Sequence, residues 1–314
     1  MSTTTYLLPN FLGELFEQGR RPNATLQLIG GVGGARNVQS WQFPVGQQYV
    51  VPPHAASTAR LEGADAPAHV GTVRAPITNV TQIWQESVIV SYSKQAASQM
   101  LAGLGVGGMS DPVTDELDFQ TGVKLEFMAR NLNWTILNQT FNQPVDNTQA
   151  RRTRGLLPAI TTTVIANGGV PRALALGLFD DAFAGLIAGG GVADGDNVIA
   201  LANTAQMRRL NELFRVQKLA VDDERFIGGV RVRTVWTTFG VLNFVLDQDM
   251  PQDEIALVNF DALQLVATEV PGKGVLFREE LAKTGANERY QIYGELGLDH
   301  GPEWLHARIT DLTV

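Results

Sequence analysis

One long helical segment limits most strongly what this chain can fold into. Asp111 is a good N-cap, Pro112 suits the first helical position, and acidic side chains fill the turn where the helix dipole favours anions. Those acidic residues are Asp115, Glu116 and Asp118. Residues 142–144, Asn-Gln-Pro, end the pattern. The sequence therefore predicts a helix over residues 112–141, a rod about 45 Å long.

The apolar residues of this helix fall on two opposite faces. One face carries Leu125, Met128, Leu132 and Ile136. The other carries Val123, Phe127, Trp134, Leu137 and Phe141. A surface helix shows one apolar stripe, so two opposed stripes indicate burial on both sides. A central helix in an ordinary α+β core explains the pattern equally well, and periodicity alone leaves both interpretations open.

The rest of the chain interleaves helices and strands without regular βαβ alternation, which predicts the α+β class. Further helices are predicted over residues 180–188 and 203–215. Strands are predicted over residues 161–166, 230–239, 241–246, 255–260, 263–268, 290–298 and 305–312.

The N-terminal third is unlike a compact domain. The first 40 residues hold a short amphipathic stretch at 11–16, a glycine-rich run at 30–34 and few apolar residues outside 6–16, so we expect an extended arm with one small helix at the amphipathic stretch. This arm should contribute little to the subunit core. Strand-like runs at 41–51 and 81–92 flank a stretch rich in proline, alanine and glycine, which predicts a projecting two-stranded flap. Such a hairpin is marginal alone and needs another surface to lie on.

Composition excludes several classes of protein. The 314 residues include no cysteine, so neither disulfides nor thiolate metal sites hold the fold together. A net charge of −8 argues against tight nucleic-acid binding, although an acidic protein can still enclose DNA. There is no apolar run long enough to span a bilayer and no secretory pattern at the N-terminus. A cytoplasmic protein with no membrane partner is expected.

Two short strings resemble parts of a serine acyl-enzyme site. Ser91-Tyr-Ser-Lys94 and Lys283-Thr-Gly285 match two of its three elements. The Ser-Asp-Asn element is missing, and Ser91 follows a strand-like run, although a helix could begin soon after it. We therefore interpret both strings as chance matches.

No other constellation supports chemistry. The glycine run at 30–34 lacks the following helix that a dinucleotide site needs, and the acidic run at 247–254 is expected to be a solvated loop. The four histidines have no partner at metal-site spacing. These histidines are His54, His69, His300 and His306. The sequence thus predicts no catalytic, cofactor-binding or metal-binding residue, no cofactor, and no enzyme.

A C-terminal block at residues 272–277, 281–285 and 290–295 strongly resembles one family of tailed-bacteriophage major capsid proteins. A preceding block resembles the same family at residues 238–240, 250–253 and 258–261. A flap region does so at residues 61–65, 79–83 and 88–92. The resemblance runs from about Tyr6 to Leu312.

The resemblance implies the HK-97-type capsid fold, with an N-terminal arm, an extended loop, a peripheral domain and an axial domain. The expected divisions are an arm (1–40), an extended loop (41–92), a peripheral domain with the spine helix 112–141 (93–160), an axial domain (161–264) and a return to the peripheral domain (265–314). It also implies that the spine packs on its own sheet and under the extended loop of a neighbouring subunit.

The implied function is a shell protein that self-assembles as hexamers and pentamers into an icosahedral phage head around double-stranded DNA. It would hold DNA without sequence-specific contacts, in a virion assembled in the bacterial host cytoplasm. A scaffolding protein, a portal protein and decoration proteins are expected partners. The alternative on the same fold is the shell protein of a bacterial nanocompartment.

Overall fold

The computed structural model describes residues 22–49, 59–66, 71, 73–95, 115–190, 198–217, 222–227, 230–237 and 240–314. The helices are α1 (Ala24–Leu28), α3 (Glu116–Asn138), α4 (Leu156–Ala159), α5 (Leu176–Ala188) and α6 (Thr204–Gln217), with short 3-10 turns η2 (Val32–Gly34), η4 (Phe260–Ala262) and η5 (Glu303–Leu305). In the described part of the chain, no helix is long and apolar enough to cross a membrane.

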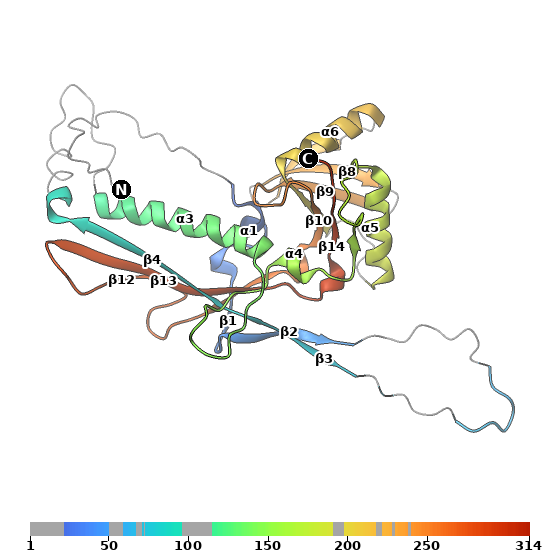
Figure 1. Cartoon of the computed structure of the whole chain (residues 1–314), viewed down its shortest axis with the longest axis horizontal. Coiled ribbons are helices and arrows are strands. Elements are labelled where there is room, and N and C mark those ends of the chain that lie inside the picture. Colours follow the sequence, from blue (N-terminus) through green and yellow to red (C-terminus); the bar gives the residue numbers. More distant parts are fainter. Residues whose placement is uncertain are drawn as a thin grey trace.

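An elongated five-stranded sheet lies alongside α3 (Figure 1). It contains β1 (Arg36–Val38), β4 (Gln82–Ser91), β11 (Gln264–Thr268), β12 (Leu276–Glu280) and β13 (Asn287–Asp299). The 13-residue strand β13 is the central strand of this sheet. Strand β4 pairs along one edge of β13, and β11 and β12 pair with successive parts of the other edge. The parallel strand β1 joins at β11.

A seven-stranded sheet forms the other end of the body, flanked by α5 and α6 (Figure 1). Its strands, in spatial order, are β5 (Val164–Ile165), β14 (Ala307–Ile309), β10 (Ile255–Asn259), β6 (Val198–Ala202), β9 (Gly240–Leu246), β8 (Val230–Thr237) and β7 (Asp222–Ile227).

The centre of this sheet is buried on both faces. Every residue of β6 and of β10 is buried. Because successive side chains of a strand point to opposite faces, Ile199 and Leu201 enter the core beneath α3, whereas Ala200 enters the core beneath α5 and α6. The two cores therefore share one sheet. This mixture of helices and strands confirms the α+β class.

The long helix exists but is shorter than predicted. It begins at Glu116, because the carboxylate of Asp115 accepts hydrogen bonds from the backbone N–H groups of Leu117 and Asp118. Asp115 is thus the N-cap rather than a first-turn residue, and Asp111 lies outside the described residues. At its other end the helix stops at Asn138, and Gln139 is extended.

The close approach of a second chain segment accounts for this early end. The Gly155 N–H donates to the Gln139 carbonyl oxygen at 2.8 Å. A Cβ atom on Gly155 would lie 2.7 Å from the Gln139 nitrogen and 2.9 Å from the Thr135 carbonyl oxygen. Only glycine allows this contact, which stacks α4 on the end of α3.

The predicted pairing of the flap strands was wrong. The projecting hairpin consists of β2 (Gln42–Gln48) and β3 (Ala75–Val80), which pair with each other. Residues 82–91 instead form β4 and pair with β13. The alternation of β4 explains this, because Trp84, Val88 and Val90 are buried against α3 as one face of a core sheet.

The prediction that the first 40 residues contribute little to the core was wrong for residues 23–38. Ala24, Thr25 and Leu26 are buried, and the two apolar ones belong to the core beneath α3. Further along, Arg36 ion-pairs with Asp299 at 2.7 Å, and its strand β1 pairs with β11. Five-residue α1 has no periodic signal, so its burial depends on contacts with distant segments. The domain boundaries themselves stay predictions.

The remaining elements follow the expected order, with differences in length and some omissions. Helix α5 begins at Leu176, four residues before the predicted start, and α6 begins at Thr204, one residue after its predicted start. Strands β5 and β14 are shorter than the strands predicted over 161–166 and 305–312. The sequence did not identify α1, α4, β1, β3, β6, β7 or β12 as elements. Strand β6, Val-Ile-Ala-Leu-Ala, has no polar alternation, because both of its faces are buried.

Candidate assembly surface

One face of α3 is buried and the other is an exposed apolar stripe. Met128, Leu132 and Ile136 face the core. The side chains of Val123, Phe127 and Trp134 lie on the other face and are 45–48% exposed. We call these last three residues the spine stripe. Nothing in the described part of the chain covers it.

The membership of the two predicted faces needs correction at three positions. Leu125 was assigned to the inner face but is 40% exposed. Leu137 was assigned to the outer face but is fully buried, because Leu156 and Leu157 of α4 pack in the same core at the end of the helix. Phe141 lies beyond the helix, under the Arg154 guanidinium at 4.5 Å.

A groove of about 780 Å³ opens beside Trp134 at the C-terminal end of the spine stripe. The ring of Trp41, the side chain of Ile83 and the loop of residues 144–152 form its other walls. Trp41, Ile83 and Trp134 are all more than one-third exposed. Three large apolar side chains therefore line part of a depression that is open to solvent, and most of its other lining residues are polar or charged.

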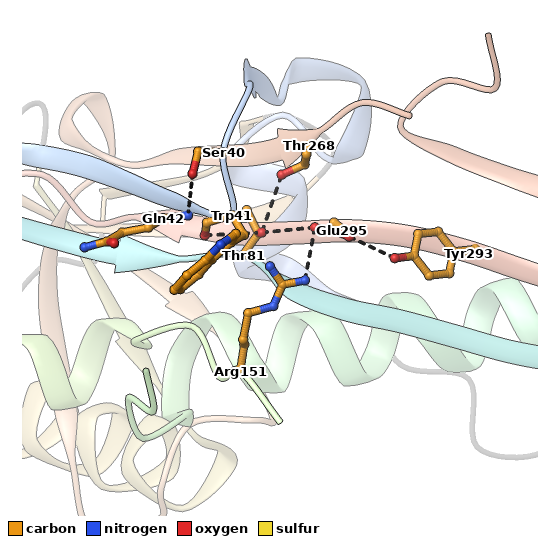
Figure 2. A network of polar contacts seen from close by, with 8 residues as sticks. All are labelled: Ser40, Trp41, Gln42, Thr81, Arg151, Thr268, Tyr293 and Glu295. Atoms are coloured by element: carbon orange, nitrogen blue, oxygen red, sulfur yellow. Dashed lines mark hydrogen bonds and ion pairs between the residues drawn. The ribbon is translucent and has the colours of Figure 1, made fainter. Parts of the chain in front are cut away.

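Arg151 holds one wall of this groove in place (Figure 2). Its Nη2 lies 3.3 Å from Oε2 of Glu295 on β13, and its guanidinium carbon lies 5.5 Å from the centre of the Trp41 ring. Both charged side chains are mostly buried. The phenol of Tyr293 donates to Oε1 of Glu295 at 2.8 Å, and burial together with this bond raises the pKa of Tyr293.

Thr81 is the single residue between β3 and β4, and it anchors the base of the hairpin to the sheet. Its N–H donates to the Trp41 carbonyl oxygen at 2.8 Å. Its buried hydroxyl lies 3.4 Å from that oxygen and 3.4 Å from Oε2 of Glu295, as Figure 2 shows. The hydroxyl proton can serve only one acceptor at a time. The hairpin thus leaves the body through a hydrogen-bonded hinge.

The outer face of β4 adds a second exposed apolar region. Ile83 and Ile89 point away from the core and are 45% and 55% exposed. On the neighbouring strands, Phe277 and Tyr293 lie with ring centres 5.7 Å apart. A monomer leaves these faces in water, which is typical of surfaces that bind other proteins.

The acidic run at 247–254 is a solvated loop only in part: Asp253 is exposed, as predicted, but Asp247 is 1% exposed, contrary to prediction. Its carboxylate accepts hydrogen bonds from Thr25 N–H at 3.0 Å, Thr25 Oγ1 at 2.7 Å and the Asn133 amide at 3.1 Å. Asp247 therefore joins α1, α3 and the end of β9.

The acyl-enzyme strings lie close together but lack catalytic geometry. Ser91 ends β4, and its hydroxyl accepts a hydrogen bond from the backbone N–H of Lys94 at 3.4 Å. The Lys94 ammonium ion-pairs with Glu116 at 2.5 Å. Lys94 is the residue that would have to act as the base, and this ion pair holds it in its charged form. Lys283 lies 5.8 Å from the centre of the Tyr92 ring.

The other candidates have structural roles. His306 is buried, accepts a hydrogen bond from Asn259 N–H at 3.2 Å through Nδ1, and lies 2.8 Å from the His300 carbonyl oxygen through Nε2. Burial lowers the pKa of His306 to about 4 and also lowers the pKa of His300.

Gly30 and Gly31 adopt positive φ and precede η2 and β1, not a long helix. His54 and His69 lie outside the described residues. Among the residues that the structure does describe, no cluster of side chains could hold a metal ion.

Sequence reasoning missed the contacts that build this surface. Trp41, Arg151 and Glu295 are separated by more than a hundred residues along the chain, and none belongs to a recognisable motif. The only available signal was the two-faced helix, which identified the spine stripe but not the groove.

Comparison with known structures supports the HK-97-type fold. The capsid asymmetric unit of cyanophage A-1(L) matches with a TM-score of 0.66 and 15% identity, over 100% of this chain and 99% of that one. The capsid protein of an empty GTA particle matches with a TM-score of 0.56 and 15% identity, over 100% and 98%. The holo-SrpI encapsulin complex of Synechococcus elongatus PCC 7942 matches with a TM-score of 0.60 and 10% identity, over 96% and 92%. At these identities the likeness establishes the fold alone.

Sequence comparison identifies the family. A search of curated protein sequences found no match. The family model of the SU10 major capsid protein, in contrast, matches residues 1–313. Since this match covers nearly the whole chain, the protein belongs to the SU10 major capsid protein family.

Proposed function

We propose that this chain is the structural subunit of a phage head and that it assembles as pentamers and hexamers into a closed icosahedral shell. The observation that carries the proposal is the spine stripe. Val123, Phe127 and Trp134 lie on one face of α3 and are about half exposed, with no cover in the described part of the chain. In a closed shell, contacts with neighbouring subunits would cover this face in every copy of the chain.

The hairpin β2–β3 supports the same conclusion. It projects from the body in Figure 1, and hydrogen bonds of Trp41, Asn79 and Thr81 hold its base. Two strands alone are marginally stable in water, so a hairpin of this kind gains stability by lying on another surface. We propose that it lies across a neighbouring subunit, as the extended loop of the HK-97-type fold implies.

The shell would enclose double-stranded DNA without binding it specifically, since the chain carries a net charge of −8. We further propose assembly in the host cytoplasm, aided by a scaffolding protein, with portal and decoration proteins joining the virion. In this role the protein catalyses no reaction.

Electron microscopy and sedimentation of the purified chain, alone and co-expressed with its scaffolding protein, test the proposal. We expect closed shells built of pentamers and hexamers. Stable monomers under all of these conditions would contradict it.

The likeness to an encapsulin shell gives the nanocompartment alternative a specific basis. The contents of the particles distinguish the two functions. Nuclease-protected double-stranded DNA in particles from infected cells supports the phage head, whereas a packaged enzyme without DNA supports the nanocompartment.

A further inference from the structure

The turn after β5 carries the one Asn-Gly pair of the whole sequence, Asn167–Gly168. Val170 N–H donates to the Asn167 carbonyl oxygen at 3.2 Å, and φ is +65° at Gly168 and +81° at Gly169. Positive φ at both central positions is typical of a type I′ turn. Every residue from 167 to 170 is exposed, so the pair lies in a tight turn that is open to water.

This setting allows the pair to react with itself. Asparagine is among the thermally labile residues, because the backbone nitrogen of the following residue can attack its amide carbon. No side chain hinders that approach at Gly168, where an added Cβ would meet nothing within 4 Å. In the described part of the chain the Gly168 N–H donates no hydrogen bond. The amide nitrogen of Asn167, which is the leaving group, donates only to the Val170 carbonyl oxygen, at 2.7 Å.

The C-terminal tail is attached to this same turn. The carboxylate of Asp311 accepts hydrogen bonds from the Asn167 N–H at 2.6 Å and the Gly169 N–H at 3.1 Å. Asp311 has a φ of +60° and is the only residue other than glycine with positive φ among the described residues. Such a backbone conformation persists only where surrounding contacts hold it. The turn is therefore one of the contacts that keep Asp311 in place.

Beyond Asp311 the tail closes part of the core beneath α5 and α6. Leu312 is 2% exposed and packs in that core. Thr313 N–H donates to the Arg172 carbonyl oxygen at 2.9 Å, and the side-chain amide of Gln206 donates to the Thr313 carbonyl oxygen at 3.0 Å. A weaker contact at Asp311 would loosen the segment that keeps Leu312 buried.

We infer that Asn167 is a site of spontaneous deamidation and that its product weakens the attachment of the C-terminal tail. The Gly168 nitrogen bonds to Cγ of Asn167, the Cγ–Nδ2 bond breaks, and ammonia leaves with the proton from the Gly168 nitrogen. The product is a cyclic imide. Water then opens the ring at either carbonyl and leaves aspartate or isoaspartate at position 167. The reaction needs no enzyme, metal ion or second subunit.

The reaction replaces a neutral amide at position 167 by a carboxylate beside Asp311. Arg172 is the cation that interacts with Asp311, but its guanidinium is already bound to backbone carbonyl oxygens. Asp253 and Glu254 add negative charge to the same region, where Arg308 lies 3.9 Å from Glu254. Like charges repel, so the product should hold Asp311 less firmly than the amide does.

Peptide mass spectrometry of the incubated full-length protein tests the reaction. Trypsin releases residues 155–172, in which Asn167 is the only amide side chain, and residues 284–289, in which Asn287 is the only one. In warm, mildly alkaline buffer, residues 155–172 should convert progressively to the carboxyl form and become a substrate for an isoaspartyl methyltransferase. The peptide with Asn287, which precedes Glu288, is the control and should stay unchanged. Equal conversion of the two peptides, or no conversion of residues 155–172, overturns the inference.

A charge cycle tests the effect on the tail. Asn167→Asp reproduces the aspartate product and should lower the melting temperature by about 2–4 °C. The neutral control Asn167→Gln should melt within about 1 °C of the natural chain. In an Asp311→Asn background, where asparagine tolerates the same φ, Asn167→Asp should change the melting temperature by less than about 1 °C. An equal fall in both backgrounds, or no fall in either, would show that the new charge does not act on the tail and would overturn that part of the inference.

Discussion

The side-chain amide of Asn133 donates to both carboxylate oxygens of Asp247, at 3.1 Å each, and both residues are buried. The amide oxygen of Asn133 also accepts a hydrogen bond from the Leu26 N–H at 3.0 Å. One side chain of α3 thereby connects α1 to the loop after β9. Within the described residues this buried carboxylate has no cationic partner, and neutral donors satisfy it.

Replacing this amide should destabilise the subunit. Asn133→Ala leaves the Asp247 carboxylate and the Leu26 N–H short of partners, and we expect a loss of about 3 kcal/mol in the free energy of unfolding. Denaturant unfolding followed by circular dichroism measures this loss. Asn131→Ala, at an exposed position of the same helix, should change the stability by less than about 0.5 kcal/mol. Equal effects of the two changes would refute the role of Asn133.

Truncation separates the two parts of the N-terminal segment. Deleting residues 2–21 should leave the stability of the isolated subunit nearly unchanged. Deleting residues 2–30 also removes the buried Ala24 and Leu26 and the hydrogen bonds of Thr25 to Asp247, and should cost roughly 3 kcal/mol or more. Thermal unfolding of the two truncations measures the difference. Identical melting curves would show that α1 contributes nothing to the core.

The two faces of α3 should respond differently to a charge. Leu132 is 4% exposed, so Leu132→Asp buries an unpaired carboxylate and should prevent soluble folding. Trp134 is 48% exposed, so Trp134→Asp should give a folded monomer that does not form shells. Circular dichroism and electron microscopy together distinguish these outcomes, and Trp134→Phe serves as the conservative control. Normal shells from Trp134→Asp would mean that the spine stripe is not an interface.

Acid should destabilise the subunit through His306. Its pKa in the folded chain is about 4, below the ordinary value of 6.5, because the buried ring resists protonation. The unfolded chain therefore binds the extra proton first. The free energy of unfolding is therefore unaffected by this histidine above about pH 6.5. It falls as the pH drops from 6.5 toward 4, by up to ~3 kcal/mol. Denaturant unfolding at pH 7.5, 5.5 and 4.5 measures this fall, which should be smaller in His306→Gln. An unchanged slope in that variant would assign the effect to other groups.

Ser91 should prove inert. The Lys94 ammonium is paired with Glu116, so this amine is not free to activate the Ser91 hydroxyl. A fluorescent penicillin should therefore not label the protein, and Ser91→Ala should assemble normally. Mass spectrometry of the incubated protein provides the measurement, and stoichiometric acylation of Ser91 would contradict the structural role.

The sequence alone determined the features that depend on neighbouring residues. The long helix, α6 and most strands follow from local periodicity, which a short window of residues encodes. The order of motifs along the chain indicated the family and its fold. The apolar residues of α3 also predicted the spine stripe, since helical geometry fixes which side chains share a face.

The tertiary structure decided every feature that depends on residues distant in sequence. Asp247 looked like a member of a solvated acidic loop, and only Thr25 and Asn133 make its burial possible. Residues 82–91 could have paired within the flap, but their buried side chains match β13. The groove exists because Arg151 bridges Trp41 and Glu295, three residues that local patterns cannot connect. Hydrogen bonds and burial between distant segments depend on the whole fold, so no local pattern in the chain encodes them.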